Sequence, residues 1–457
     1  MKKLVLSFSL ICASMTLVAN DHDLSVQDTI PQDEDIKTGW TFGALPAITY
    51  STDLGFQYGG LINLFYYGDG STFPKYKHSI YAEISRFTKG SGVNRLFYDS
   101  EYLIPNIRVT SDLSFFTEKA MDFYGFNGYN AVFNHDWVDS EATDYVSRLF
   151  YRHERSMFRF IADFQGDLAG ENLNWVAGLG ILRSWIDEVD IVALNEGRDA
   201  EDQLPNVPTL YDKYVEWGII SENESRGGWA NHLKLGVVYD TRDNEPNPWS
   251  GVWSEVILFA APSIFGNGDF GYSRISATHR QYFTLVPARL SFAYRVNFQG
   301  TLSGDVPFFM LPYQINSFSA SSNTDGIGGS RTVRGILRNR VVGEASTFGN
   351  LEFRWRFLKT RLFNQNIYLA MNAFSDMGTV LREVEFDTPT AVGDSFPLQG
   401  ARVEDFFQTD AERLHITYGA GFRFVMNENF IVAVDYGMPV DNRDGNGGLY
   451  IGLNFLF

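Results

Sequence analysis

The most constraining feature of this chain is a two-residue alternation of apolar and polar side chains, which recurs from Trp40 to the C-terminus. In residues 289–298 every second position is large and apolar, and the positions between hold arginine, serine, alanine and asparagine. Because successive side chains of a β-strand point to opposite faces, the alternation predicts strands with one apolar and one polar face. Both a secreted sandwich and a membrane barrel fit this pattern.

We expect sixteen such strands, so the fold class is all-β. They are predicted at residues 40–51, 56–67, 78–87, 94–103, 108–117, 145–164, 175–189, 232–240, 253–261, 272–285, 289–298, 346–357, 367–378, 415–424, 430–438 and 449–457.

The lengths of the connections favour the barrel. Short turns, such as residues 165–174, 286–288 and 425–429, alternate with long loops at 118–144, 190–231, 299–345 and 381–414. With sixteen strands the short turns and both termini lie at one end and all long loops at the other, which is typical of outer-membrane barrels. No segment after the N-terminus has the ~18 apolar residues of a membrane helix. We therefore predict a transmembrane antiparallel β-barrel over residues 40–457.

The N-terminus has the pattern of a secretory signal peptide over residues 1–19, with Lys2 and Lys3 before an apolar stretch and a cut after Ala19. The only cysteine, Cys12, lies inside it. Residues 20–39 are acidic with few large apolar residues, which predicts a disordered linker. The formal net charge is −18, and becomes −20 without the two lysines. This acidity argues against a nucleic-acid partner, which needs clustered Lys and Arg.

One loop stands out because it carries three arginines, Arg331, Arg334 and Arg338. A guanidinium is a rigid fork of donors that binds carboxylates. The alternation places Asp376 and Glu352 on the polar faces of two neighbouring strands. If the loop folds back into the barrel, Arg334 meets both carboxylates as an internal lock, with Asp376 as the first partner. The alternative is a solvated loop arginine whose pairing contributes little.

Five motifs, taken together, resemble the BamA/TamA superfamily of outer-membrane barrels, also called the bacterial surface antigen family. The resemblance covers most of residues 40–457. The motifs are Gly328-Gly329 with Val333-Arg334-Gly335-Ile336, similar to the tip of the family's sixth outer loop; Phe374-Ser375-Asp376-Met377-Gly378; Tyr239-Asp240-Thr241-Arg242-Asp243-Asn244 with Pro248 and Gly251; Gly419-Ala420-Gly421-Phe422-Arg423; and Gly452 with Phe455 and Phe457, similar to the terminal signal by which barrels are recognised for assembly. Ile336 stands where the family has an aromatic residue.

The resemblance implies a Gram-negative outer-membrane location, insertion by the barrel-assembly machinery and contact with outer-membrane lipid. Family members insert barrels or move polypeptides across the membrane, usually with periplasmic client-receiving domains. This chain resembles the bare-barrel members without such domains. We therefore expect an assembly or translocation factor, acting at the seam between residues 40–51 and 449–457 with a separate periplasmic partner. A channel for small solutes or lipids plugged by the arginine loop, and a structural outer-membrane protein, remain alternatives.

Enzymatic chemistry is not indicated. The seven histidines lack metal-ligand spacing, and no serine has a nucleophile-elbow context with a credible histidine and acid. Residues 441–448 are rich in aspartate and glycine, but their spacing differs from a calcium loop and favours an outer hairpin. We expect no enzyme activity, cofactor or metal.

Overall fold

The computed structural model describes residues 36–453, apart from 53, 74, 246, 319–324, 363–364, 393–399 and 427–429. The predicted signal peptide, most of the predicted linker, and Phe455 and Phe457 of the terminal signal lie outside the described residues. Residues 38–457 form one compact unit, the barrel.

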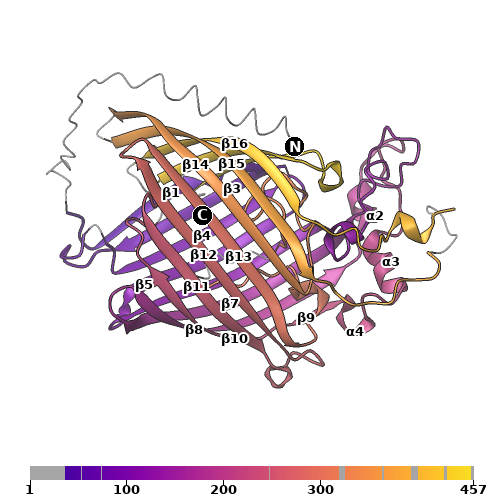
Figure 1. The fold of residues 1–457 in the computed structure, drawn as a ribbon, viewed down its shortest axis with the longest axis horizontal. Coiled ribbons are helices and arrows are strands. Elements are labelled where there is room, and N and C mark those ends of the chain that lie inside the picture. The colour runs from indigo at the N-terminus through magenta and orange to yellow at the C-terminus, as the bar shows by residue number, and fades with distance from the viewer. Residues whose placement is uncertain are drawn as a thin grey trace. The chain divides into compact units, whose positions relative to one another are not determined.

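The strands form a closed antiparallel ring with sixteen wall positions (Figure 1), which confirms the predicted fold class. Strands β1 (Trp40–Pro46) and β2 (Thr49–Ser51) both pair with β3 and make the first position. Strands β9 (Gly227–Trp229) and β10 (His232–Asp240) both pair with β8 and make the eighth. The others are β3 (Gly55–Tyr66), β4 (His78–Phe87), β5 (Gly92–Ile104), β6 (Ile107–Asp122), β7 (Arg152–Ala169), β8 (Leu173–Asp187), β11 (Gly251–Ala261), β12 (Tyr272–Val286), β13 (Leu290–Gly304), β14 (Ala345–Leu362), β15 (Gln365–Arg382), β16 (His415–Met426), β17 (Phe430–Pro439) and β18 (Gly448–Leu453). The ring closes where Tyr450 and Ile451 of β18 pair with Ser51 and Tyr50 of β2.

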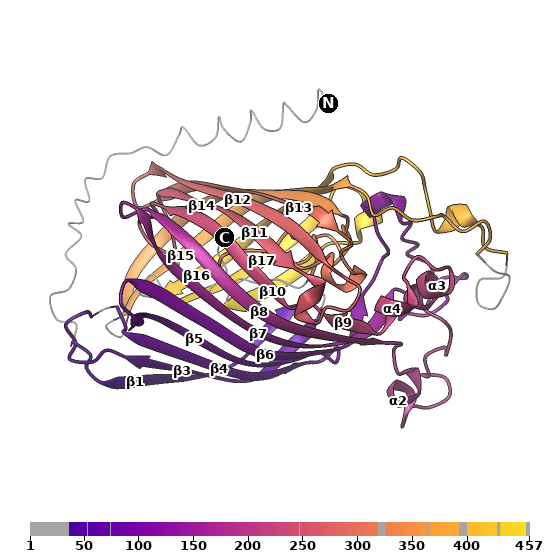
Figure 2. The ribbon, with the colours of Figure 1, turned by 90° about the horizontal axis from the view of Figure 1, so that it is seen from below.

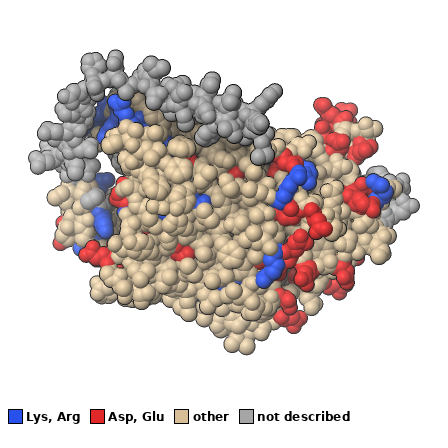
Figure 3. Space-filling view, in the orientation of Figure 1, with Lys and Arg blue, Asp and Glu red and all other residues tan. Residues whose placement is uncertain are grey.

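Each strand turns its apolar face outward. On β14, Leu351, Phe353 and Trp355 are exposed, whereas the intervening Glu352 and Arg354 are buried. Figure 3 shows the same division at the surface, with few charged residues over the middle of the barrel and many acidic ones at one end. This arrangement suits a wall with lipid outside and polar groups inside, since a soluble sandwich would bury the apolar face instead.

The long loops leave the same end of the barrel, which we call the loop end; the opposite end is the turn end. They comprise residues 123–151, 188–231, 305–344 and 383–414. The short helices α2 (Ile191–Asn195), α3 (Leu210–Glu216) and α4 (Glu222–Ser225) lie there together (Figure 2). Helix α3 begins at a capping box in which Thr209 and Asp212 exchange hydrogen bonds, which satisfies its first N–H groups. Single 3-10 turns occur at Gly128–Asn130, Ser263–Phe265, Phe308–Met310, Val403–Asp405 and Asn442–Asp444.

Most strand boundaries lie within a few residues of those predicted, and the sixth is the main error. We predicted a strand over residues 145–164, but β7 begins at Arg152. Residues 145–151 belong to the loop, where Val146, Phe150 and Tyr151 are buried against other loops. The aromatic run thus fills an apolar cluster and is not part of the wall.

That cluster, which we call the outer cap, is the main hydrophobic core. It gathers buried side chains from all four long loops and from the inner wall next to them, among them Phe123, Phe126, Trp137, Phe150, Leu210, Tyr214, Phe308, Met310 and Phe406. Ring pairs such as Phe123 with Tyr214, whose centroids are 5.1 Å apart and nearly perpendicular, connect different loops. The loops therefore pack into one body over the loop end.

Among the described residues, every helix is too short or too polar to cross a bilayer.

Candidate functional site: the arginine loop on the inner wall

The second half of the loop between β13 and β14, residues 325–344, packs against the inner wall of the barrel. Ile327, Val333 and Ile336 form a small buried cluster with Phe348 of β14 and Val380 of β15. Ile336, at the position where the family has an aromatic residue, is 1% exposed. Apolar residues on both sides of Arg334 therefore fix its backbone close to the wall.

Arg334 is buried among three carboxylates. Its Nε donates to Oδ2 of Asp376 at 2.8 Å, and Nη2 donates to Oδ1 of the same residue at 3.0 Å. Its backbone N–H also donates to Asp376, at 3.0 Å. Its Nη1 lies 2.9 Å from Glu352 and 3.3 Å from Asp435. The sequence-predicted residues Arg334, Asp376 and Glu352 are thus brought together, and Asp435 is an additional partner.

Two further arginines balance this acidic group. Arg354 donates to Glu352 at 2.9 Å, and Arg423 makes two hydrogen bonds to Asp435, at 2.8 and 2.9 Å. Asp376, which is fully buried, has Arg334 as its cation among the ion pairs of the described residues. Glu352 and Asp435 therefore each have a second cation, which makes Asp376 the carboxylate most dependent on Arg334.

Phe374 completes the binding site, because the Arg334 guanidinium carbon lies 3.6 Å from the centre of its ring. A guanidinium over an aromatic face is attracted by the ring quadrupole. Burial disfavours the charged form of Arg334, but the nearby carboxylates outweigh it and hold its pKa well above the ordinary value. Arg334 is therefore a permanent cation in a buried, preformed site.

Glycines let the loop approach the wall closely. Gly335 has φ of +97°, and a Cβ there would lie 2.5 Å from the backbone carbon of Gly437 on β17. A Cβ on Gly378 would lie 2.8 Å from Ile327. Real Cβ atoms do not approach other atoms this closely, so both positions require glycine. The N–H of Gly335 donates to the Tyr450 hydroxyl at 3.2 Å, which connects the loop to the last strand.

A second anchor lies four residues further on. Arg338 donates to Asp122 at 2.9 Å and to Glu118 at 2.8 Å, both on β6. Arg340 donates to the carbonyls of Gly128 and Ala131 in the loop between β6 and β7. The loop therefore bridges β14, β15 and β17 on one side of the barrel to β6 on another.

The sequence-predicted residues divide between the site and the wall. Val333, Arg334, Gly335, Ile336, Phe374 and Gly378 lie together with the two predicted carboxylates. Gly452 lies on β18 opposite Ala433 and is not part of this group. Asp435 was not predicted, although it is the only acidic residue in 430–438 and the alternation places it on the polar face. The contacts of Arg338 have no comparable sequence signal.

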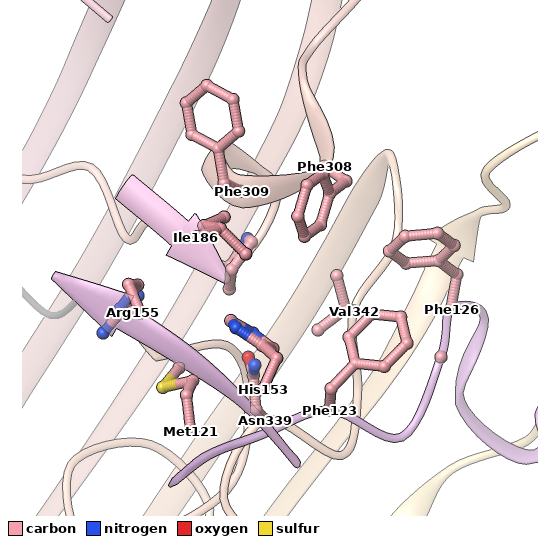
Figure 4. Close-up of a pocket in the computed structure, with 12 residues that line it drawn as sticks. Met121, Phe123, Phe126, His153, Arg155, Ile186, Phe308, Phe309, Asn339 and Val342 are labelled. Carbon is pink, nitrogen blue, oxygen red and sulfur yellow. The ribbon is translucent and has the colours of Figure 1, made fainter. Parts of the chain in front are cut away.

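A small cavity lies where the outer cap meets the wall. It is lined by Phe123, His153, Ile186, Phe308 and Val342 among others (Figure 4). Its volume is about 20 Å³, which leaves room for about one water molecule. The described residues contain no group of three or more His, Cys, Asp or Glu side chains arranged to hold a metal. The absence of enzyme activity stays a prediction.

Comparison with known proteins agrees with this fold. The family model described as the Omp85 superfamily domain matches residues 78–457. Among solved structures, BamA from Haemophilus ducreyi lacking POTRA domains 1–3 is 14% identical with a TM-score of 0.52, covering 91% of this chain and 70% of that one. CdiB from Escherichia coli, at 9% identity and a TM-score of 0.48, covers 91% of this chain and 62% of its own. At such identities the likeness to BamA shows the fold alone. No curated protein sequence matches the chain.

Proposed function

Because this chain belongs to the Omp85 superfamily, we propose that it is an assembly or translocation factor for outer-membrane proteins or lipids, working with a separate periplasmic partner. Its barrel is an outer-membrane barrel. The loop end faces the outside and the turn end faces the periplasm in this proposal. The client would be handled at the seam between the first and last strands.

The seam between the first and last strands carries this proposal. In the described part of the chain, β18 (Gly448–Leu453) pairs with the three-residue β2 through Tyr450 and Ile451. Beside these pairs, the backbone N–H of Thr52 donates to the Leu449 carbonyl at 3.0 Å. Gly452, next to these pairs, contributes no side chain to the seam. When the seam opens, each of its strand edges is a template to which another strand can add.

The arginine loop fits the same role as an internal strut. We propose that Arg334, Asp376 and Glu352 lock the loop to β14 and β15, so that this part of the wall stays rigid when the seam opens. The support for this lock is the buried, four-contact geometry of Arg334 with Asp376 and Glu352.

A channel for small solutes or lipids is the second candidate, favoured by one observation. Arg331 is exposed although the next residues, Thr332 and Val333, are buried. Its carbonyl accepts a hydrogen bond from Arg295 of the inner wall, so its exposed side chain lies inside the barrel. Water therefore reaches part of the interior. Against an open channel, the outer cap and residues 325–344 occupy the loop end and the inner wall.

Depletion of the protein followed by outer-membrane proteomics tests these functions. A loss of many other barrels supports the assembly role. Unchanged barrel levels with altered solute permeability would favour the channel, and no change in either would favour a structural protein. Copurification after mild detergent extraction identifies the periplasmic partner, and a protein that consistently purifies without one would contradict that part of the proposal.

A further inference from the structure

The turn between β10 and β11, at the turn end, has a fixed shape. The carboxylate of Asp243 accepts hydrogen bonds from the backbone N–H of Trp249 at 2.9 Å and from the Ser250 hydroxyl at 3.2 Å. Gly251 has φ of +102°, and a Cβ there would lie 2.2 Å from the carbonyl oxygen of Thr241. We call residues 241–245 and 247–250 the strap. Its geometry makes it a defined element and not a solvated hairpin.

One side of the strap binds β6. Glu245 lies 3.3 Å from Nη1 of Arg108, and Arg108 also makes two hydrogen bonds to Asp99 of β5, at 2.8 and 2.9 Å. Tyr76, from the neighbouring turn, donates to Asp99 at 2.8 Å. Glu245 is 53% exposed, so its ion pair with Arg108 is a weak and reversible contact.

The other side binds β14 and β15. Asn247, which is 4% exposed, donates to the Tyr368 hydroxyl at 2.6 Å. The guanidinium carbon of Arg356 lies 4.3 Å from the ring centre of Trp249 and 3.7 Å from that of Tyr368. Two aromatic contacts to one cation make this the stronger attachment.

The two attachments lie on opposite walls. Strand β6 is the fifth wall position of the ring and β15 the thirteenth, which are eight positions apart among sixteen. The strap starts from the eighth and ninth positions, so reaching both walls places it across the middle of the mouth. Phe318, from the loop between β13 and β14, lies beside the β6 attachment, with its ring 5.0 Å from the Arg108 guanidinium and 5.8 Å from Phe97.

We propose that the strap closes the turn-end mouth of the barrel and opens by releasing Glu245 from Arg108 while the Trp249 side remains attached. The closure separates the wet interior around Arg331 from the solution beyond the turn end. A molecule entering the barrel from that side must first displace the strap. This inference stands on the contacts of the strap and does not require the assembly role.

Thiol labelling tests the closure, because the only cysteine of the chain, Cys12, lies in the predicted signal peptide. Arg331→Cys places a reporter inside the barrel, and a bulky and a small maleimide are compared on the folded protein in detergent. With the strap intact the bulky reagent should label slowly. Glu245→Arg puts like charges opposite each other, and Trp249→Ala removes the stack on Arg356. Each should raise the bulky-reagent rate by about tenfold and the small-reagent rate by less than twofold.

The matched control is Asp69→Asn, an exposed residue paired with Lys77 in another turn at the same end. It should leave both rates unchanged. Heat-modifiable gel migration verifies that each variant is folded. If Trp249→Ala does not fold, Glu245→Arg alone tests the closure, because Glu245 is largely exposed and its replacement leaves the buried contacts intact. Equal bulky-reagent rates in folded Arg331→Cys barrels with and without Glu245→Arg would overturn the proposal, as would an equal increase in the Asp69→Asn control.

Discussion

Replacing Arg334 with alanine should lower the free energy of unfolding of the barrel, and the geometry of the site limits how large this loss can be. The change removes the shared cation from three buried carboxylates. Glu352 keeps Arg354, and Asp435 keeps Arg423, so Asp376 alone loses its charged partner. Leaving one uncompensated buried charge costs about 3–5 kcal/mol. We therefore expect a loss of about 3–5 kcal/mol in the free energy of unfolding, rather than a multiple of it for three carboxylates.

A double-mutant cycle separates this effect from general damage to the loop. Asp376→Ala should also destabilise, because Arg334 loses its bidentate partner. The double variant Arg334→Ala/Asp376→Ala contains neither the unpaired carboxylate nor the guanidinium without its partner. Its loss of unfolding free energy should therefore be about 2–3 kcal/mol less than the sum of the two single losses. Arg334→Lys, which keeps the charge but not the planar fork, should give an intermediate loss.

The measurement is urea unfolding in lipid vesicles, followed by tryptophan fluorescence, with heat-modifiable gel migration to count folded barrels. The chain contains nine tryptophans as reporters. Single-variant losses below about 1 kcal/mol, the range of solvent-exposed ion pairs, would refute the internal lock. Strict additivity in the double variant would refute the assignment of Asp376 as the partner whose charge matters.

Three other predictions follow from the loop and its surroundings. Gly335→Ala should lower the yield of folded barrel, because the new methyl group meets the Gly437 backbone and the residue must keep a positive φ; heat-modifiable migration would show it. Gly400→Ala has the same positive-φ strain, at +77°, but its Cβ meets nothing, so it is the control for the clash and should lower the yield less. Arg338→Gln should destabilise by less than the about 3–5 kcal/mol expected for Arg334→Ala in the same urea assay, since its partners keep other cations, Glu118 with Arg155 and Asp122 with Arg152. Burial opposes ionisation of Glu412, but hydrogen bonds from His415 and two backbone N–H groups keep its pKa below the usual value. The contribution of ionised Glu412 to the free energy of unfolding is therefore complete above its unfolded pKa of about 4.3, and is lost as the pH falls through its lower folded pKa. In urea unfolding measured over a range of pH, Glu412→Gln should therefore lose less stability at acid pH than the wild type.

The wall of the barrel could be predicted from the sequence because two solvents act on it. Lipid outside and polar groups inside impose a strict two-residue period, so 78–87 and 232–240 were predicted with the same bounds as β4 and β10. The loops are subject to no such period. Residues 145–151 resemble a strand in composition, yet their aromatic side chains fill the outer cap, where position depends on three other loops. The local sequence pattern therefore predicts the strands but does not predict the packing of the loops in the outer cap.

The candidate site divides in the same way. Asp376 and Glu352 could be assigned to the inner face because alternation fixes the direction of each side chain. Asp435 follows from the same rule applied to one more strand. Glu118 and Asp122 could not be paired with Arg338, because that requires the path of a forty-residue loop, 305–344, which no periodic pattern encodes. The bonds of the strap to opposite walls likewise depend on the closed ring.

The Arg334 site also has a consequence for the order in which the barrel assembles. The arginine lies before all of its carboxylates in the chain, and those carboxylates arrive on three different strands, β14, β15 and β17. The last contact of the loop, from Gly335 to Tyr450, waits for β18. A complete site therefore exists only when the C-terminal strands are paired in register. An incomplete or misregistered ring would leave the buried guanidinium of Arg334 without part of its carboxylates, which disfavours it against the closed barrel.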